Sequence, residues 1–344
     1  MTSRAEDKSS TPMGQVQVLR SNLALFARRN GLQLGIIGVF FAILIFFILA
    51  APNTFLAPDI YRAFMTSVPF FGVMALPLTL VVISGEIDLS VGSTMAVGMT
   101  AFTLVFMQTN NIILSLVACL IAGFMVGILN GFIVVRIGIP SLIATLGMQY
   151  FWRGVVLVIV DATMAGGGSS LVAARGTVVR DALVGRVGGY LPMQMVWMVL
   201  MGIAMWILLN RHKFGAHVFL VGDNKQSAQL MGVNVNRTRM LVFALVGIAA
   251  AFGGTLSSLD VSYFWPSLGE GYWLKTLAAV FLGGTSVFGG TGTILGTFIG
   301  CFIIGGLEAG IIAVGAKGMW TQVIFGLIIV VSVAMHAFVR RRTE

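Results

Sequence analysis

The sequence of 344 residues has little charge. Only 10% of its residues are Asp, Glu, Lys or Arg, whereas 58% are hydrophobic. Soluble domains carry about 25% charged residues, so this chain has too few to cover a surface of its size in water. The mean hydropathy is +0.98. The composition therefore excludes a soluble globular protein and predicts an all-α polytopic membrane protein, since helices satisfy their own backbone hydrogen bonds in a bilayer.

Residues that carry out chemistry are also scarce. The two cysteines, Cys119 and Cys301, lie within apolar runs, so we interpret them as packing residues and predict no disulfide. The three histidines lie at the borders of apolar runs and belong to no cluster with metal-ligand spacing, which predicts no metal site. No lysine follows a glycine, so the sequence contains no P-loop, and no catalytic set of Ser, His, Asp or Cys is recognisable. We therefore expect no catalytic residue, no cofactor and no ATPase site in this chain.

The net charge is +9, which in a soluble protein would suggest a nucleic-acid partner. No nucleic-acid-binding motif accompanies it. Basic residues collect on the cytoplasmic side of membrane proteins, and this explains the charge better. The sequence therefore predicts contact with membrane lipid and no nucleic-acid partner.

Ten apolar runs have about the length of a transmembrane helix. We place them near residues 33–51, 61–83, 92–108, 112–134, 139–160, 191–209, 240–258, 272–288, 292–313 and 319–338. Residues 1–30 and 341–344 are then terminal tails, and residues 31–340 form a single transmembrane domain. Its longest loops are 161–190 on one side and 210–239 on the other. An even number of spans puts both termini on the same side.

The basic residues predict which side that is. The tails and the loops on their side carry Arg4, Lys8, Arg20, Arg28, Arg29, Arg136, Arg211, Lys213, Lys225, Arg237, Arg239, Arg340, Arg341 and Arg342. The opposite loops carry only Arg62, Arg175, Arg180, Arg186 and Lys317. By the positive-inside rule both termini and the 210–239 loop are cytoplasmic, and the 161–190 loop faces outward.

A short helix is predicted within the long polar stretch 211–239. Asp223 is placed to be its N-cap, and Gln226 would complete a capping box. Residues 224–231 are helix formers, and Gly232 suits the C′ position. The sequence therefore places a small capped helix on a basic cytoplasmic loop.

Two spans are interrupted by Gly/Ser-rich segments, at 84–93 and 283–292, and each segment is followed at once by another apolar run. We expect broken or re-entrant backbone at both places, in addition to kinks at Pro69 and Pro77 in the second span. The two segments align weakly with each other, Gly85 with Gly284 and Gly92 with Gly292, about 200 residues apart. Such internal repetition is common in transporters.

Glycine at every fourth position marks two helices for close packing. The runs are Gly123, Gly127 and Gly131 on the fourth span, and Gly292, Gly296 and Gly300 on the ninth. Packing within the bundle is favoured over a seam between two copies, although the motif fits both.

Polar residues inside apolar runs are costly, so they usually face partners, water or a transport pathway. The candidates for a translocation pathway are Glu86, Asp88, Asn130, Gln149 and Glu308. For Asp88, capping of the following helix is an equally good interpretation. For Glu308, the alternatives are a side chain that reaches the interface or a buried pair with Lys275.

Four segments together resemble the permease subunits of ribose-type ABC sugar importers. They are ISGEIDLSVGS (83–93), NGFIVVRIGIPSLIATLGM (130–148), GDNKQSAQLMGVNV (222–235) and GEGYWLKTLAAVFLGGTSVFGGTGTILGT (269–297). Their order and spacing match, and the resemblance extends from about residue 33 to residue 340. Ser84 stands where the family usually has a second glycine.

The resemblance implies a permease of the bacterial inner membrane that imports a simple sugar or polyol. Its partners would be a second permease copy, a periplasmic sugar-binding protein, and an ATPase subunit that carries ATP and Mg. The segment 222–235 would be the coupling helix that rests on the ATPase. The coupling residues would be Gly222, Asp223, Asn224, Gln226, Ala228, Leu230, Met231 and Gly232.

Three alternatives remain at this stage. The short helix could lie at the membrane interface as an amphipathic surface helix. The chain could be a stand-alone transporter driven by protons or ions through Glu86, Asp88 or Glu308. A membrane-embedded enzyme is disfavoured by the missing catalytic set.

Overall fold

The fold is that of a computed structural model, which describes residues 31, 33–164 and 166–343. The predicted tail 1–30 lies outside the described residues. In chain order the elements are the first span (Gln33–Ala50), α2 (Pro52–Phe55), α3 (Pro58–Ile83), α4 (Val91–Thr109), α5 (Ile112–Phe132), a π-helical turn (Ile133–Ile137), α6 (Ser141–Thr163), β1 (Ser169–Ser170), a 3-10 turn (Val172–Ala174), α7 (Val178–Val184), β2 (Arg186–Val187), β3 (Leu191–Pro192), α8 (Met193–Asn210), α9 (Lys213–Asp223), α10 (Lys225–Leu230), α11 (Val235–Val261), β4 (Tyr263–Phe264), α12 (Tyr272–Leu282), α13 (Ile294–Ala313) and α14 (Trp320–Thr343).

The described part of the chain contains eight helices that are long and apolar enough to cross a membrane, and the all-α polytopic class is confirmed. Two shorter apolar helices, Tyr272–Leu282 and Trp320–Met335, accompany them. The eighth predicted span, 272–288, is too long, because α12 ends at Leu282. At about 1.5 Å per residue, α12 is roughly half as long as the hydrocarbon core is thick.

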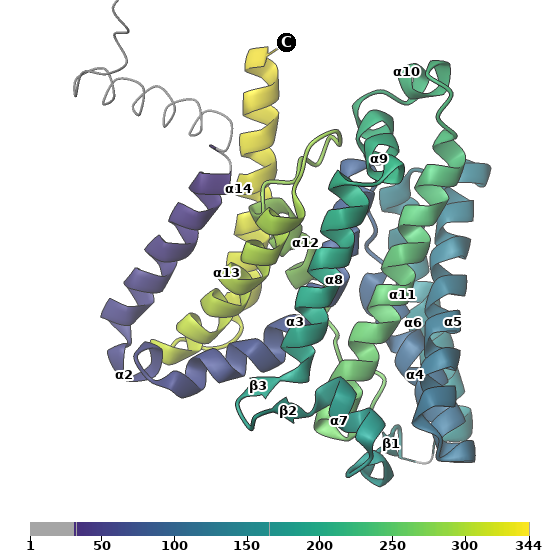
Figure 1. The fold of residues 1–344 in the computed structure, drawn as a ribbon, viewed down its shortest axis with the longest axis vertical. Helices are drawn as coiled ribbons and strands as arrows, with labels where there is room; N and C mark the ends of the chain where they lie inside the picture. The colour runs from purple at the N-terminus through teal and green to yellow at the C-terminus, as the bar shows by residue number, and fades with distance from the viewer. Residues whose placement is uncertain (1–30, 32, 165, 344) are drawn as a thin grey trace, which may run out of the picture.

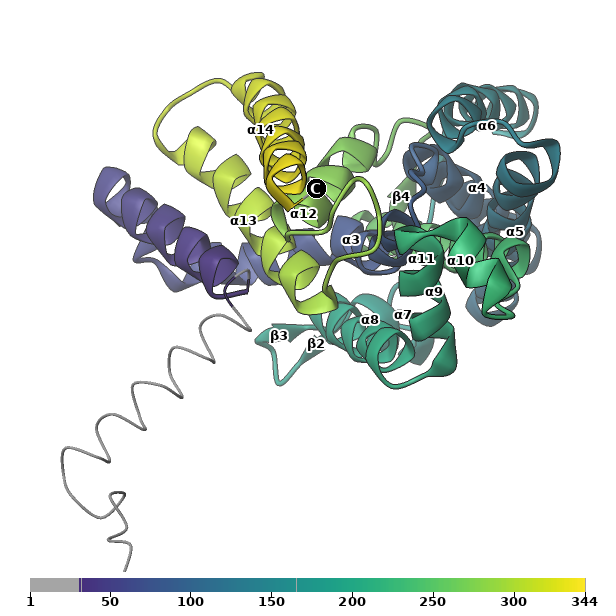
Figure 2. The same cartoon turned by 90° about the horizontal axis from the view of Figure 1, so that it is seen from above.

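Helices α3 and α11 form the centre of the bundle. Of the most apolar 18-residue stretch of α3, 89% is buried, whereas only 11% of the corresponding stretch of the first span is buried. Figure 2 shows α3 and α11 between the first span, α13 and α14 on one side and α4, α5 and α6 on the other. Helix α3 stays continuous through Pro69 and Pro77, so the expected kinks do not interrupt it. The peripheral helices present apolar side chains outward, as a lipid environment requires.

The glycine run on α5 faces α11. A Cβ atom on Gly123 would lie 2.4 Å from the carbonyl oxygen of Gly247, and one on Gly127 would lie 2.4 Å from that of Phe243. Gly131 lies against Met240 of the same helix. The run on α5 therefore packs two helices of one chain together at backbone distance.

The second run faces α12 in the same way. A Cβ atom on Gly296 would lie 2.1 Å from the carbonyl oxygen of Gly283, and one on Gly300 would lie 2.3 Å from that of Ala279. Gly292 precedes α13 and lies against Thr285. Both glycine runs thus make contacts within the chain, as the interpretation of bundle packing predicts.

Short strands and small helices lie at the ends of the bundle. Strand β1 pairs antiparallel with β4, and β2 with β3. In Figure 1, α7 and the β2–β3 pair lie at one end, while α10, the end of α14 and the start of the first span lie at the other. The two long loops therefore face opposite sides. Helix α14 continues through Thr343, so residues 341–343 of the expected tail are helical.

Candidate functional site: the junction beneath α10

Helix α10 begins one residue later than expected. Its N-cap is Asn224, whose side-chain oxygen accepts a hydrogen bond from the Ser227 N–H at 2.9 Å. Asp223, the predicted N-cap, is instead the last residue of α9. Asn224 is extended (φ −154°), which is the backbone conformation that a cap needs and that helical Asp223 lacks. The predicted capping box with Gln226 is therefore wrong.

The end of α10 follows the prediction. Gly232 has a positive φ of 80° and occupies the C′ position. Its N–H donates to the Gln229 carbonyl at 2.9 Å, and the Val233 N–H donates to the Ala228 carbonyl at 3.0 Å. These two bonds make a Schellman motif. They fix the direction in which the chain leaves α10.

One side of α10 is anchored and the other is open. Ala228 is fully buried in a small cluster with Val221, Val233 and Val235. Leu230, in contrast, is 90% exposed, and its neighbour Met231 is 58% exposed. A large exposed apolar tip among polar residues is typical of a contact surface for another protein.

The end of α9 lies directly against the interrupted segments on both sides. A Cβ atom on Gly222 would lie 1.7 Å from the carbonyl oxygen of Ile83 and 2.6 Å from the amide nitrogen of Gly290. The Gly290 N–H itself donates to the Ile83 carbonyl at 2.9 Å. The end of α3, the 283–293 segment and the end of α9 therefore meet at one point. We call this point the coupling junction (Ile83, Gly85, Gly222, Gly289 and Gly290).

The two interruptions have the same local geometry. Gly85 (φ 79°) follows the end of α3, and Gly284 (φ 80°) follows the end of α12. In each case the next residue, Glu86 or Thr285, donates its N–H to a carbonyl five residues back, at 3.1 and 3.3 Å. Both helices thus end in Schellman motifs. The weak sequence match that pairs Gly85 with Gly284 has a structural counterpart.

Glu86 connects the first interruption to the start of α10 and to the first turns of α11. Its side chain is buried, and its Oε1 atom lies 2.8 Å from Lys225 Nζ and 2.6 Å from Arg239 Nη2. Lys225 is the first residue of α10, and Arg239 lies near the start of α11. The structure therefore places this pathway candidate in an ion-pair cluster beside the coupling junction.

The extended segment after Gly85 is held by side chains of α6. The Ile87 N–H donates to Ser141 Oγ at 3.1 Å, and the Leu89 N–H donates to Thr145 Oγ1 at 3.0 Å. Ser141 and Thr145 are four residues apart, so they share one face of the helix. They supply acceptors that the irregular backbone would otherwise lack.

The start of α4 is held by three more of the candidate residues. Its N-cap is Ser90, and the Asp88 carboxylate accepts hydrogen bonds from the N–H and hydroxyl of Ser90 at 2.8 and 2.6 Å. Asn130 Nδ2 contacts Ser90 Oγ at 2.6 Å, and Gln149 Oε1 accepts from the Ser93 N–H at 3.2 Å. Asp88 lies between two spans, where burial raises the pKa of its carboxyl to about 6 against the lowering effect of Ser90. In the structure, these three side chains therefore fix the start of α4 through Ser90 and Ser93.

Glu308 belongs to a different cluster. Lys275 of α12 contacts both Glu308 carboxylate oxygens of α13 at 2.7 Å. The Lys275 ammonium also lies 5.2 Å from the centre of the Tyr272 ring. Both charged side chains are partly exposed, and the pair joins two helices of the bundle. This is the arrangement named as the alternative to a pathway role.

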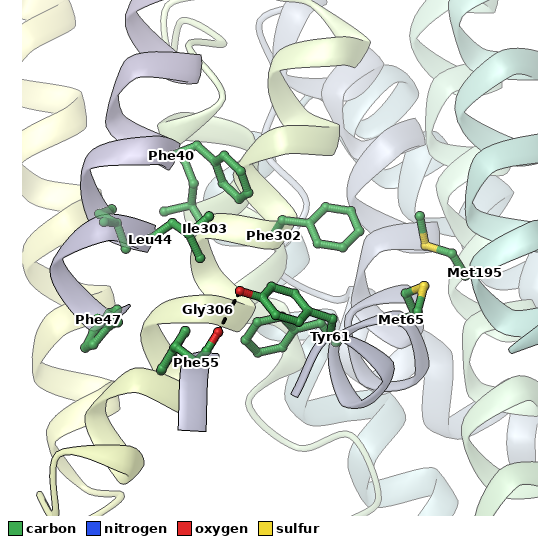
Figure 3. A pocket seen from close by; sticks show the side chains of 12 residues that line it. Phe40, Leu44, Phe47, Phe55, Tyr61, Met65, Met195, Phe302, Ile303 and Gly306 are labelled. Carbon is green, nitrogen blue, oxygen red and sulfur yellow. Dashed lines mark hydrogen bonds between the residues drawn. The ribbon is translucent and has the colours of Figure 1, made fainter. Parts of the chain in front are cut away.

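The pocket in Figure 3 is unsuited to a polar solute. It has a volume of about 310 Å³ and lies between the first span, the start of α3 and α13. Aromatic and aliphatic side chains line it, and the Tyr61 hydroxyl donates to the Phe55 carbonyl at 2.8 Å. A polar cavity of about 570 Å³ lies at the other end of the bundle from α10, beside α7, and is lined by Arg180, Asp181, Arg186 and Asp260 among others. Among the described residues, no three His, Cys, Asp or Glu side chains are grouped to hold a metal ion.

Comparison with known proteins agrees with this architecture. Residues 60–333 match the family described as branched-chain amino acid transport system / permease component. The chain is 32% identical to the ribose import permease protein of Escherichia coli (strain K12) over 289 residues, which cover 82% of this chain and 87% of that protein. It is 31% identical to the ribose import permease protein of Bacillus subtilis (strain 168), covering 87% and 90% of the two chains.

A third relative has a different named solute. The autoinducer 2 import system permease protein of Salmonella typhi is 31% identical over 275 residues, which cover 77% of this chain and 81% of that protein. No solved structure matches the chain. The matches confirm the resemblance to sugar-importer permeases, and the chain belongs to the family of branched-chain amino acid transport system permease components, which includes these ribose and autoinducer 2 permeases.

Proposed function

We propose that this chain is the membrane-spanning permease of an ABC importer for a simple sugar or polyol. The energy comes from ATP hydrolysis on a separate ATPase subunit, which holds ATP and Mg. The relatives that import ribose support the solute class. The observation that carries the coupling role is the position of α10, which has an exposed tip and follows directly on the end of α9 at the coupling junction.

The ATPase subunit docks on α10 in this proposal. Leu230 and Met231 supply apolar contact area, and polar residues surround them. The basic residues of the tails and of the 210–239 loop put this side in the cytoplasm of a bacterial cell, where the ATPase would be. A push on α10 then reaches the ends of α3 and α9 and the 283–293 segment, because backbone atoms touch there.

The opposite end of the bundle receives the sugar-binding protein. The polar cavity beside α7 presents two arginines and two aspartates at that end. A surface that presents both positive and negative side chains suits a transient partner that must bind and then dissociate. In this proposal the 161–190 loop is therefore the docking surface for the binding protein.

A second permease copy completes the pore. Several peripheral helices present apolar side chains, and these meet either lipid or the second copy. Glu308 pairs with Lys275, but its side chain is still 35% exposed, so it stays the candidate of this cluster for the translocation pathway. In this function the exposed part of Glu308 contacts the solute.

The substitution Leu230→Asp tests the docking surface. A charge at the centre of an apolar contact disrupts binding of the ATPase, so we expect uptake to fall at least about tenfold, with membrane insertion unchanged. Gln229→Asp is the matched control, because it adds the same charge on the exposed side of α10 without removing the apolar tip. Unchanged uptake by Leu230→Asp in proteoliposomes that contain the ATPase contradicts the docking role.

The same proteoliposomes separate the importer from an ion-driven transporter. Uptake by the permease alone, driven by a proton or sodium gradient and without the ATPase, would establish the second function. Uptake that requires the ATPase, ATP and the binding protein supports the importer.

A further inference from the structure

Glu86 holds the 210–239 loop at two places, at the start of α10 and in the first turns of α11. One carboxylate oxygen contacts Lys225 where α10 starts and Arg239 where α11 starts. The side chain of Glu86 is 4% exposed and that of Arg239 is 14% exposed, so water screens this contact poorly. A buried carboxylate that loses its cations loses most of its stabilisation. The loop and Glu86 are therefore expected to move together.

The backbone of Glu86 belongs to a different element. Its N–H closes the Schellman motif of α3 by donating to the Val81 carbonyl at 3.1 Å. The residues that follow, Ile87 and Leu89, bind α6 through their own N–H groups. Glu86 is thus fixed to the end of the most buried helix by its main chain and to the coupling loop by its side chain.

The two cations that bind Glu86 come from different helices. Lys225 is the first residue of α10, and Arg239 lies in the second turn of α11. The close backbone packing around Gly222 can only push, because it is steric. The ion pairs can also pull, which a reversible stroke requires.

We propose that Glu86 is the positioning residue through which α10 moves the end of α3 and the 84–93 segment. It acts on the transport cycle through Lys225 and Arg239 and does not contact the solute. This inference rests on the proposed docking of an ATPase on α10. It replaces a pathway role for Glu86, and the two roles predict different results for the cations that bind it.

The experiment follows movement instead of transport, so it needs no knowledge of the solute. Two distances between spin labels on introduced cysteines are measured. The first joins Gln229 in α10 to Leu49 on the first span, and the second joins Leu89 in the 84–93 segment to Leu49. Cys119 and Cys301 are fully buried and do not compete for the label. The permease is assembled with its ATPase, and distances are compared before and after trapping with ATP and vanadate.

In the otherwise unchanged protein both distances shift on trapping. In Glu86→Gln and in Lys225→Gln, we expect the Gln229 distance to shift as before and the Leu89 shift to be lost. Lys225→Arg keeps the ion pair and keeps both shifts. Lys213→Gln, which removes an exposed cation from the same loop, also keeps both.

The outcomes are separable. A Leu89 shift that survives in both Glu86→Gln and Lys225→Gln overturns the inference. Loss of the shift in Glu86→Gln alone also overturns it, because the cation at α10 would then have no part. If Glu86→Gln fails to fold, the comparison of Lys225→Gln with Lys225→Arg still tests the inference, because the Lys225 side chain is half-exposed. Absence of a Gln229 shift in the unchanged protein contradicts the ATPase docking itself.

Discussion

Replacing Gly222 by alanine is the most direct way to disturb the coupling junction. The new Cβ atom would lie 1.7 Å from the Ile83 carbonyl oxygen and 2.6 Å from the Gly290 amide nitrogen, whereas ordinary contacts begin at 3.4 Å. Both neighbours are backbone atoms, so neither can rotate away as a flexible side chain would. The main chains of two segments must separate to admit one methyl group.

The cost follows from two opposing effects. Overpacking a close contact costs about 1–3 kcal/mol and sometimes more, and a clash with two backbone segments belongs at the upper end. Alanine gains roughly 0.5–1 kcal/mol over glycine inside a helix, and Gly222 is a helical residue of α9. We therefore expect Gly222→Ala to destabilise the folded protein by about 2 kcal/mol and to lower uptake, since it also shifts α10.

Thermal unfolding in detergent at a fixed scan rate measures the first effect, and uptake into proteoliposomes measures the second. The control is Gly147→Ala in α6, where a Cβ atom meets nothing within 4 Å. This control should be as stable as the unchanged protein or slightly more so. A Gly222→Ala protein whose Tm equals that of the control would refute the close contact at the junction.

Two further predictions concern the other clusters. Thr145→Val removes the acceptor of the partly buried Leu89 N–H and should cost about 1–3 kcal/mol in unfolding free energy, while Thr163→Val, at an exposed hydroxyl bonded within its own helix, should be neutral. Lys275→Met leaves the Glu308 carboxylate without its cation, so the Tm should fall. Because the pair is partly exposed, the loss of unfolding free energy should be smaller than the about 3–5 kcal/mol typical of breaking a fully buried pair. Adding Glu308→Met to Lys275→Met should restore most of the Tm, and a further fall would show that the two side chains do not act as a pair.

Local signals in the sequence predicted the features that depend on a few adjacent residues. Gly232 ends α10 because glycine adopts the positive φ of a C′ position at little cost. The glycine run of α5 packs at backbone distance because its spacing puts the three residues on one face. Both inferences need only the period of a helix and the properties of glycine.

The sequence did not reveal α9 or its place at the junction. The segment 211–223 begins with Arg, His and Lys, which favoured a loop, although Gly215, Val218 and Val221 recur with helical spacing and are buried. That spacing was the available signal. The extent of α12 was also missed, because hydropathy continues past the Gly283-Gly284 pair where backbone geometry ends the helix.

The partners of Glu86 lay beyond any local pattern. Lys225 is 139 residues away in sequence, and the lysines and arginines of the loop are alike in composition. Only the packing of α9 against the ends of α3 and the 283–293 segment decides which cations reach the carboxylate. The sequence therefore identified Glu86 as a candidate, but its assignment to a pathway depended only on its being an ionisable residue among apolar runs.

The repeated geometry of the two interruptions gives the junction its mechanical character. Gly85 and Gly284 end α3 and α12 in the same motif, and both segments that follow enter another apolar helix. The end of α3 contributes the Ile83 carbonyl to the junction, and the 283–293 segment contributes the Gly290 N–H that donates to it. Gly222 packs against both partners of that hydrogen bond, so a shift of α9 against the end of α3 also displaces the 283–293 segment. A displacement of α10 should therefore act on both halves of the bundle at once.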